Sequence, residues 1–265
     1  MSGPAVLPAE DGPAEHRPEA PEADMREDPS EGLAETGPDV RRHERDHAVP
    51  WALPIVVRRS KAHPAREVDV CEAAAEVVVR LLDDPRSRPG GEWHEALEHW
   101  RAGAIRKVVR RGDGQQFADA RALDCVGALV PAPGEDRGPA EALAFPPGPV
   151  RPLPRALKKL QVGGTAFPAE GESAVPAAEA VVTVELTPHH ALTSGKAAAQ
   201  CAHAAQLAYE QMPAAVRERW RAAGFRVRVE RASAEAWAAG GRSVSITDAG
   251  FTELDGPTET TRARW

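Results

Sequence analysis

Two segments of the chain, residues 100–112 and 220–232, share a pattern that limits the folds this sequence can adopt. Both begin Trp-Arg-Ala and then carry Arg, Val and Arg at matching positions. In each segment the pattern covers the end of an expected helix and the strand after it. The elements around it run in the order strand, helix, helix, strand. The sequence therefore predicts an α/β fold with two copies of one unit. Chance similarity between two helix–strand pairs is the alternative.

Hydrophobic periodicity locates the expected elements of both units. In the first unit, strands are expected at residues 53–58, 105–111, 126–130 and 142–145, and helices at residues 69–82, 93–102, 115–123 and 154–160. A double proline follows residue 145, which favours an edge strand at 142–145. In the second unit, strands are expected at residues 180–186, 225–231 and 243–247, helices at 195–211, 213–223 and 234–239, and a final edge strand at the C-terminal end.

Composition divides the chain into four segments. Residues 1–48 are rich in Pro, Glu and Ala and almost lack aromatic and β-branched residues, so we expect a disordered acidic tail. Residues 49–162 form the first unit, residues 163–178 a Gly/Pro/Glu-rich linker, and residues 179–265 the second unit. The first 50 residues carry 13 of the 40 acidic and 5 of the 33 basic side chains. The remainder is close to neutral, so RNA binding would need a local basic patch.

Cysteine usage and hydropathy predict a cytoplasmic protein. The three cysteines, Cys71, Cys125 and Cys201, are an odd number without Cys-x-x-Cys spacing, which is typical of buried thiols in a reducing compartment. No apolar run reaches the length of a membrane span, and the chain does not open on a signal peptide. We therefore expect no membrane partner.

Polar side chains line one face of the alanine-rich helix expected at residues 195–211. Lys196, Gln200 and His203 follow the spacing i, i+4 and i+7, which stacks them along that face. A lysine in the first turn opposes the helix dipole, and a nearby carboxylate or anionic ligand would compensate it. Asp248 ends a strand of the same unit, and strand ends meet helix starts at the ligand-binding rim of α/β sheets. An ordinary ion pair between Lys196 and Asp248 is the alternative.

Three other kinds of site do not fit the residues around this helix. A phosphate loop needs a glycine and a hydroxyl at positions where the chain has His190 and Ala197. Cys201 and His203 lie two residues apart on a helix and point in different directions, so they do not form a zinc-binding pair. The chain has no Gly-x-Ser-x-Gly elbow of a serine hydrolase. We expect no metal and no cofactor.

Two motifs of the second unit resemble those of one known family. Residues 195–204 read Gly-Lys-Ala-Ala-Ala-Gln-Cys-Ala-His-Ala, and residues 247–252 read Thr-Asp-Ala-Gly-Phe-Thr. They are similar to the Gly-Lys-x-Ala-Ala-Gln-x-x-His-Ala and Asp-Ala-Gly-Arg-Thr motifs of the second class of peptidyl-tRNA hydrolases, a class unrelated in fold to the widespread bacterial enzyme. The similarity covers roughly residues 180–255, and the whole chain resembles a long bacterial variant with an N-terminal extension.

The resemblance implies a four-stranded mixed sheet flanked by helices, and hydrolysis of the ester between a peptide and the tRNA 3′ ribose without a cofactor. By position, the site would be lined by Lys196, Gln200, Asp248 and Thr252, with His203 behind or beside them. Asp248 would orient or deprotonate a water, Lys196 would stabilise the oxyanion or the leaving ribose, and Gln200 and Thr252 would hold the substrate. The partner would be peptidyl-tRNA. The oligomeric state is open, with a homodimer as one option.

The chain departs from the family pattern at three positions near this site. Thr187, His189 and Phe251 stand where the family has Arg, Asp and Arg, which removes basic residues that would face RNA. Six basic residues of the first unit are candidates to bind RNA instead: Arg106, Lys107, Arg110, Arg111, Lys158 and Lys159. A solvated strand and helix face is the alternative for these six. The alternative to an enzyme is a relative of the same fold that binds RNA or protein without catalysis.

Overall fold

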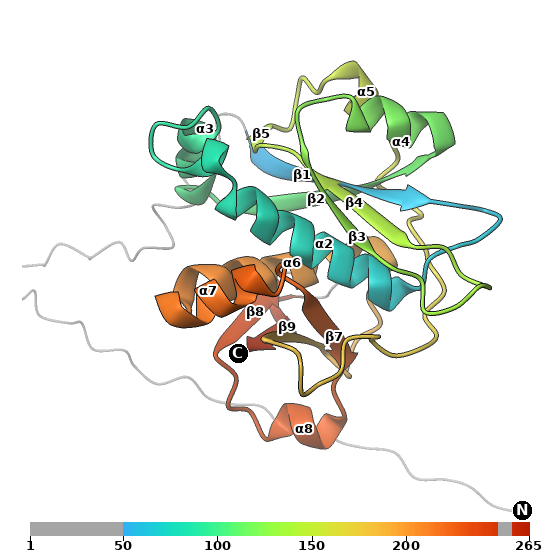
Figure 1. Ribbon diagram of the computed structural model, residues 1–265, viewed down its shortest axis with the longest axis vertical. Coiled ribbons are helices and arrows are strands. Elements are labelled where there is room, and N and C mark those ends of the chain that lie inside the picture. Colours follow the sequence, from blue (N-terminus) through green and yellow to red (C-terminus); the bar gives the residue numbers. More distant parts are fainter. Residues whose placement is uncertain (1–49, 249–255) are drawn as a thin grey trace, which may run out of the picture. The chain divides into compact units, whose positions relative to one another are not determined.

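A computed structural model describes residues 50–248 and 256–265 (Figure 1). The predicted acidic tail, Phe251 and Thr252 lie outside the described residues. The first half contains β1 (Trp51–Arg59), α2 (Glu67–Asp83), the 3₁₀ helix η1 (Pro85–Ser87), α3 (His94–Arg101), β2 (Arg106–Asp113), α4 (Gly114–Arg121), β3 (Val126–Val130), β4 (Ala140–Ala144), β5 (Gly148–Pro149) and α5 (Arg155–Lys158). The second half contains β6 (Val182–Leu186), α6 (Ser194–Gln211), α7 (Ala214–Ala222), β7 (Val227–Arg231), α8 (Ala234–Ala238), β8 (Val244–Asp248) and β9 (Thr258–Arg264).

Each half builds one mixed sheet, and the two sheets have the same strand order. The first runs β2-β1-β4-β3, with β5 also paired to β1, and the second runs β7-β6-β9-β8. In each sheet the two strands joined by a helix pair are parallel, and the last long strand of the half is inserted antiparallel beside them. The predicted α/β class, with mixed sheets flanked by helices, is thereby confirmed. Duplication of one ancestral unit stays a prediction.

The repeated Trp-Arg-Ala pattern marks the same turn in both halves. Trp100 and Trp220 are buried at the ends of α3 and α7. The indole N–H of Trp100 donates to the carbonyl oxygen six residues later at 2.9 Å, and Trp220 does the same at 2.8 Å. Between helix and strand, Ile105 (φ 43°) and Phe225 (φ 61°) take the left-handed conformation that non-glycine residues rarely adopt. Each indole therefore fastens the start of a strand to the preceding helix.

The two long helices α2 and α6 pack against each other between the sheets (Figure 1). α2 also contacts β3 and β4, and α6 contacts β6 and β9. Buried side chains surround α2 on every side, as is typical of a helix enclosed by two layers. Where the helices meet, a hydrogen bond to Cys201 and burial raise the pKa of the Cys71 thiol. Both cysteines are free and buried, so the α2–α6 contact is part of the main core.

Each of these helices also covers an edge of the opposite half's sheet. β2 and β7 are edge strands, and exposed edges of this kind invite unwanted pairing with other chains. On β7, the Val229 N–H donates to Glu72 Oε1 of α2 at 3.1 Å. On β2, Lys107 Nζ donates to Gln206 Oε1 of α6 at 2.5 Å. The two halves therefore protect each other's sheets as well as sharing a core.

Two strands predicted at sheet edges lie inside their sheets. β4 pairs with both β1 and β3, and β9 pairs with both β6 and β8. The edge prediction for β4 is wrong because Pro146 and Pro147 follow the last paired residue, Ala144, and remove no N–H from the ladder itself. The edge prediction for β9 is wrong because the last strand in sequence is inserted between two earlier strands.

The predicted linker, residues 163–178, packs against the N-terminal ends of both central helices. The N–H of Glu67, the first residue of α2, donates to the carbonyl of Pro168 at 2.7 Å. The N–H of Phe167 donates to Oγ of Ser194, the first residue of α6, at 3.0 Å. Thr165 and Phe167 are buried. This segment therefore ties the starts of α2 and α6 together.

The outer faces of the two sheets are covered in different ways. Under α4 and α5 the first sheet carries an apolar cluster of Val56, Phe117, Ala120, Leu143, Phe145, Leu157 and Leu160. On the second sheet, Glu185 is 1% exposed and pairs with Arg242 at 2.8 Å and with Arg264 at 2.6 Å. Trp237 of the short helix α8 lies 4.0 Å from the Arg262 guanidinium on the same face, so ion pairs and one short helix stand where the first half has α4 and α5 over apolar side chains. Within the residues that the structure describes, no helix is long and apolar enough to cross a membrane.

Candidate functional site

Two of the predicted site residues, Lys196 and Gln200, converge on one carboxylate oxygen of a third, Asp248. Lys196 Nζ donates to Asp248 Oδ2 at 2.6 Å, and Gln200 Nε2 donates to the same oxygen at 2.7 Å. The side chains of Lys196 and Asp248 are 14% and 15% exposed, so the pair is partly withdrawn from water but still reachable. A carboxylate that accepts from an ammonium and an amide is held in a fixed orientation.

The start of α6 positions Lys196 in this cluster. Thr193 caps the helix, and its Oγ1 accepts from the backbone N–H of Lys196 at 3.4 Å. Gly195 lies against Thr165 so closely that a Cβ on Gly195 would stand 3.2 Å from the Thr165 Cβ. The chain therefore starts the helix tightly, with Lys196 in its first turn. Asp248, at the end of β8, supplies the negative charge that this helix start requires.

Two threonines of β9 fix Gln200, and sequence reasoning did not single them out. Thr260 Oγ1 lies 3.0 Å from Gln200 Oε1 as a donor, and Thr261 Oγ1 donates to the Gln200 carbonyl at 3.2 Å. Because its Oε1 accepts from Thr260, the amide of Gln200 turns its N–H group toward Asp248. Both threonines are fully buried. The only signal in the sequence was the unusual run of threonines in the final strand.

The cluster lies at the rim where three parallel strands end. β6, β7 and β8 run in one direction and end at Leu186, Arg231 and Asp248. α6 begins at the same rim. In open α/β sheets, ligands bind at this end of the strands, where helix starts and strand ends come together. The position therefore suits a binding or catalytic site better than a plain surface would.

The other predicted residues around this rim have different surroundings. His203 is half-buried on α6, three residues beyond Gln200. Thr187 is buried, its N–H donates to the carbonyl of Thr260 at 3.0 Å, and its Oγ1 accepts from the N–H of His189 at 3.3 Å. Thr187 therefore closes the turn after β6. Thr252 falls in the segment that the structure does not describe.

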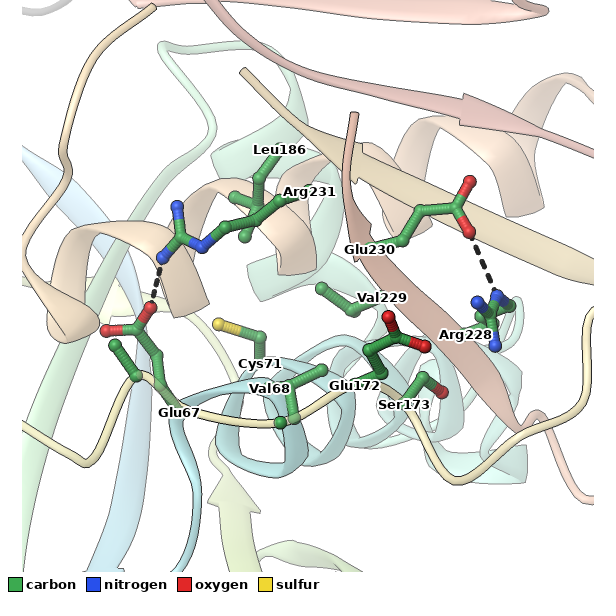
Figure 2. A pocket seen from close by; sticks show the side chains of 12 residues that line it. Glu67, Val68, Cys71, Glu172, Ser173, Leu186, Arg228, Val229, Glu230 and Arg231 are labelled. Atoms are coloured by element: carbon green, nitrogen blue, oxygen red, sulfur yellow. Dashed lines mark hydrogen bonds and ion pairs between the residues drawn. The ribbon is translucent and has the colours of Figure 1, made fainter. Parts of the chain in front are cut away.

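A cavity of about 300 Å³ opens at the same rim and shares no lining residue with the cluster (Figure 2). Its walls come from the start of α2, the strand β7 and residues 169–173. Figure 2 shows Arg231 paired with Glu67 and Arg228 paired with Glu230, the latter at 2.9 Å. Glu67 Oε2 also accepts from Ser194 Oγ at 2.6 Å, which links this wall to the start of α6. Sequence reasoning gave no indication of this cavity.

The six basic residues proposed for RNA binding fall into two groups. Lys107 is turned inward: its ammonium bonds Gln206, lies 4.9 Å from the Trp100 ring, and has its pKa lowered to about 7 by burial. Arg110 is half-buried and donates to the Leu160 carbonyl at 3.3 Å. At the surface the structure leaves Arg106, Lys158 and Lys159 exposed and Arg111 half-buried.

Two further observations bear on the chemistry that these residues can support. Within residues 50–248 and 256–265, no three His, Cys, Asp or Glu side chains gather in a way that could hold a metal ion. No protein-family model, curated protein or solved structure matches the chain. The geometry of the rim is therefore the basis on which a function is proposed.

Proposed function

We propose that the chain hydrolyses the ester bond between a peptide and the 3′ ribose of tRNA. The observation that carries the proposal is the shared oxygen of Asp248, which accepts from Lys196 Nζ at 2.6 Å and from Gln200 Nε2 at 2.7 Å. Residues of two motifs that stand 48 or more positions apart in the sequence thus meet at one point. The resemblance of those motifs to second-class peptidyl-tRNA hydrolases names the substrate, and the reaction would belong to the cytoplasm.

The proposed reaction needs a positioned water and a cation near the oxygen that becomes negative. Asp248 orients the water and accepts its proton as the water oxygen attacks the ester carbonyl. Lys196 stabilises the negative charge that forms on the carbonyl oxygen. The bond between the carbonyl carbon and the ribose oxygen then breaks, and the proton passes to that oxygen. The products are a peptide with a free carboxylate and a tRNA with a free 3′-hydroxyl.

Gln200 has a positioning role in this proposal. Its amide N–H group holds Asp248 Oδ2, while Thr260 and Thr261 of β9 hold Gln200 in turn. The carboxylate is thereby kept in one orientation when Lys196 shifts toward the substrate. Preorganised groups of this kind contribute to catalysis because they do not have to be ordered during the reaction.

The test is deacylation of an N-acetylated aminoacyl-tRNA by wild type, Lys196→Ala and Asp248→Asn. We expect each variant to lose roughly 10²- to 10⁴-fold in kcat, the range for loss of an acid–base or oxyanion-stabilising group. Lys61→Ala is the matched control, because Lys61 is an exposed lysine on a loop of the first half. Wild-type rates in both site variants would contradict the proposal.

A non-catalytic relative that binds RNA or protein is the competing function. The same ion pair, with only 14% and 15% of its side chains exposed, would stabilise the rim of such a protein as well. Binding of tRNA with no turnover by the wild type would support this alternative. Turnover of small acyl esters that compete fully with peptidyl-tRNA would instead indicate a less specific esterase.

A further inference from the structure

We infer that the first half carries a phosphate-binding surface for the body of the RNA substrate, centred on α5. The α5 basic surface consists of Arg111, Arg151, Arg155, Lys158 and Lys159. This inference rests on the proposed function for the identity of the RNA. It adds a binding site, remote from the reacting ester, in the half that lacks the Lys–Gln–Asp cluster.

Charge is the first argument for this surface. The chain has no Asp or Glu between Glu141 and Glu170, and four basic residues stand in that interval. All four, Arg151, Arg155, Lys158 and Lys159, are exposed. The acidic tail accounts for the formal net charge of −7 and the rest of the chain is close to neutral, so this concentration of positive charge is local. A local cluster of Lys and Arg is the feature that binds phosphates in a protein without an overall positive charge.

Rigid support is the second argument. Leu157 and Leu160 are buried in the apolar cluster below α5, which leaves the adjoining lysines outside. The strand β2 holds the same segment: the N–H of Arg111 donates to the carbonyl of Gln161 at 2.9 Å. The Arg111 guanidinium also bonds the Gln161 side chain. The positive charges are therefore mounted on packed structure, which lowers the entropy lost when they bind phosphates.

Continuity with the candidate site is the third argument. The chain runs from Lys159 to Thr165, and Thr165 packs directly against Gly195, the residue before Lys196. Thr165 Oγ1 donates to the Val162 carbonyl at 3.0 Å, which folds this segment on itself. Six residues span at most about 20 Å, so the surface lies within reach of one tRNA acceptor arm whose 3′ end is at Lys196. In Figure 1 this segment follows α5 and leads toward the second half.

The chemistry of the surface favours an RNA backbone over a protein partner. Along the segment from Lys158 to Thr165, Val162 is the one large exposed apolar side chain, at 47% exposure, and the described residues hold one other, Leu129 on β3. A protein interface would require an apolar or aromatic centre. Lysine and arginine side chains without such a centre suit contacts to phosphates, which fix position and carry no sequence information.

The experiment compares full-length and minimal substrates for Lys158→Glu/Lys159→Glu. On an N-acetylated aminoacyl-tRNA we expect KM to rise about 10-fold, and the slope of log binding against log salt to fall by about 2, one for each phosphate that the variant no longer neutralises. On the N-acetylated aminoacyl ester of the trinucleotide CCA, which lacks the tRNA body, we expect kcat/KM to stay at the wild-type value. Lys61→Glu/Arg219→Glu is the control with the same charge change, because both residues are exposed and lie outside the surface.

Two results would overturn the inference. An unchanged KM for the full tRNA would do so, and a protein partner would then become the better occupant. An equal loss on both substrates would show damage to the fold or the rim instead of weaker binding of the tRNA body. Binding of deacylated tRNA separates this inference from the proposed function. If the wild type hydrolysed neither substrate yet bound tRNA through Lys158 and Lys159, the surface would stand and the activity would not.

Discussion

The two halves of this chain share a strand order and differ in what the equivalent positions carry. Their ladders match Val56 of β1 with Glu185 of β6, and Leu143 of β4 with Arg262 of β9. In the first half these positions are buried under α4 and α5. In the second half they form ion pairs, and the cover over Arg262 is Trp237 of the short helix α8. One topology therefore supports two chemistries, and the connectivity alone does not say which half binds a ligand.

The rim of the two sheets shows the same contrast. The ladders match Asp248, at the end of β8, with Val130 at the end of β3. Val130 is buried in the main core, whereas Asp248 is the acceptor for Lys196 and Gln200. The first half therefore cannot assemble the polar cluster. Four exposed basic residues of the first half, Arg151, Arg155, Lys158 and Lys159, lie on α5 or next to it in the chain. In our proposals the second half carries the chemistry and the first half binds the RNA body.

Exchanging the outer-face residues is the most severe test of this comparison. Val56→Glu places a carboxylate among Phe117, Leu143 and Leu157. The nearest cation in the ladder is Arg110, the cross-strand partner of Val56, and its guanidinium already donates to the Leu160 carbonyl. We expect a loss of about 4 kcal/mol or more in the free energy of unfolding, enough to unfold a marginally stable protein. Urea unfolding followed by circular dichroism measures this loss.

The reciprocal exchange, Glu185→Val, is the matched control. It removes the carboxylate that pairs with Arg242 and Arg264, whose side chains are 20% and 37% exposed. Both guanidinium groups can turn toward water, so we expect a smaller loss of about 1–3 kcal/mol. Equal losses for the two exchanges would mean that the outer faces are not chemically distinct.

Sequence patterns predicted the elements well and their arrangement less well. The long helices and the parallel strands follow from hydrophobic periodicity, because burial on one or both faces leaves a regular trace in the chain. The interior places of β4 and β9 leave no such trace, since a strand inserted between two others needs the same residues as one at an edge. The packing of α2 on α6 depends on contacts between segments more than 100 residues apart, which a local pattern cannot reveal.

The candidate site was predictable only in part, because local patterns are visible in the sequence and long-range contacts are not. Lys196 and Gln200 share a helix face, and a carboxylate was needed near that helix start, so their meeting with Asp248 follows from local rules. Thr260 was missed because a threonine in a strand is ordinary and its partner lies 60 residues away. Lys107 was grouped with surface lysines because charge in a sequence does not say which way a side chain points.

The facing helices α2 and α6 give a pH-dependent form of the comparison. α2 carries Glu72, which burial raises to a pKa of about 7, whereas α6 carries the neutral Gln206 at the corresponding edge contact. The pKa of this carboxyl is higher in the folded state than its unfolded value of 4.5, so below pH 4.5 the group is protonated in both states and does not lower the free energy of unfolding. As pH rises from 4.5 to about 7, the charged form is favoured in the unfolded state only, and the free energy of unfolding falls. Above about pH 7 this loss no longer grows.

Glu72→Gln should therefore stabilise the protein at neutral and alkaline pH. The amide keeps an acceptor for the Val229 N–H and carries no charge to bury. We expect a gain of about 1–3 kcal/mol at pH 8 that disappears near pH 4, measured by urea unfolding across that range. The control is Glu98→Gln, an exposed glutamate on α3. A gain that did not depend on pH would show that the burial of charge is not the cause.

The two tryptophans give the smallest expected effect and the closest test of equivalence. Trp100→Phe and Trp220→Phe each remove an indole N–H that donates to a carbonyl six residues later, at 2.9 Å and 2.8 Å. Each change leaves that carbonyl without its donor and a small gap in the core, for about 1–2 kcal/mol. Because the turns are alike, the two losses should agree within about 0.5 kcal/mol in urea unfolding. A difference of about 2 kcal/mol or more would mean that the halves share a strand order but not the turn that makes it.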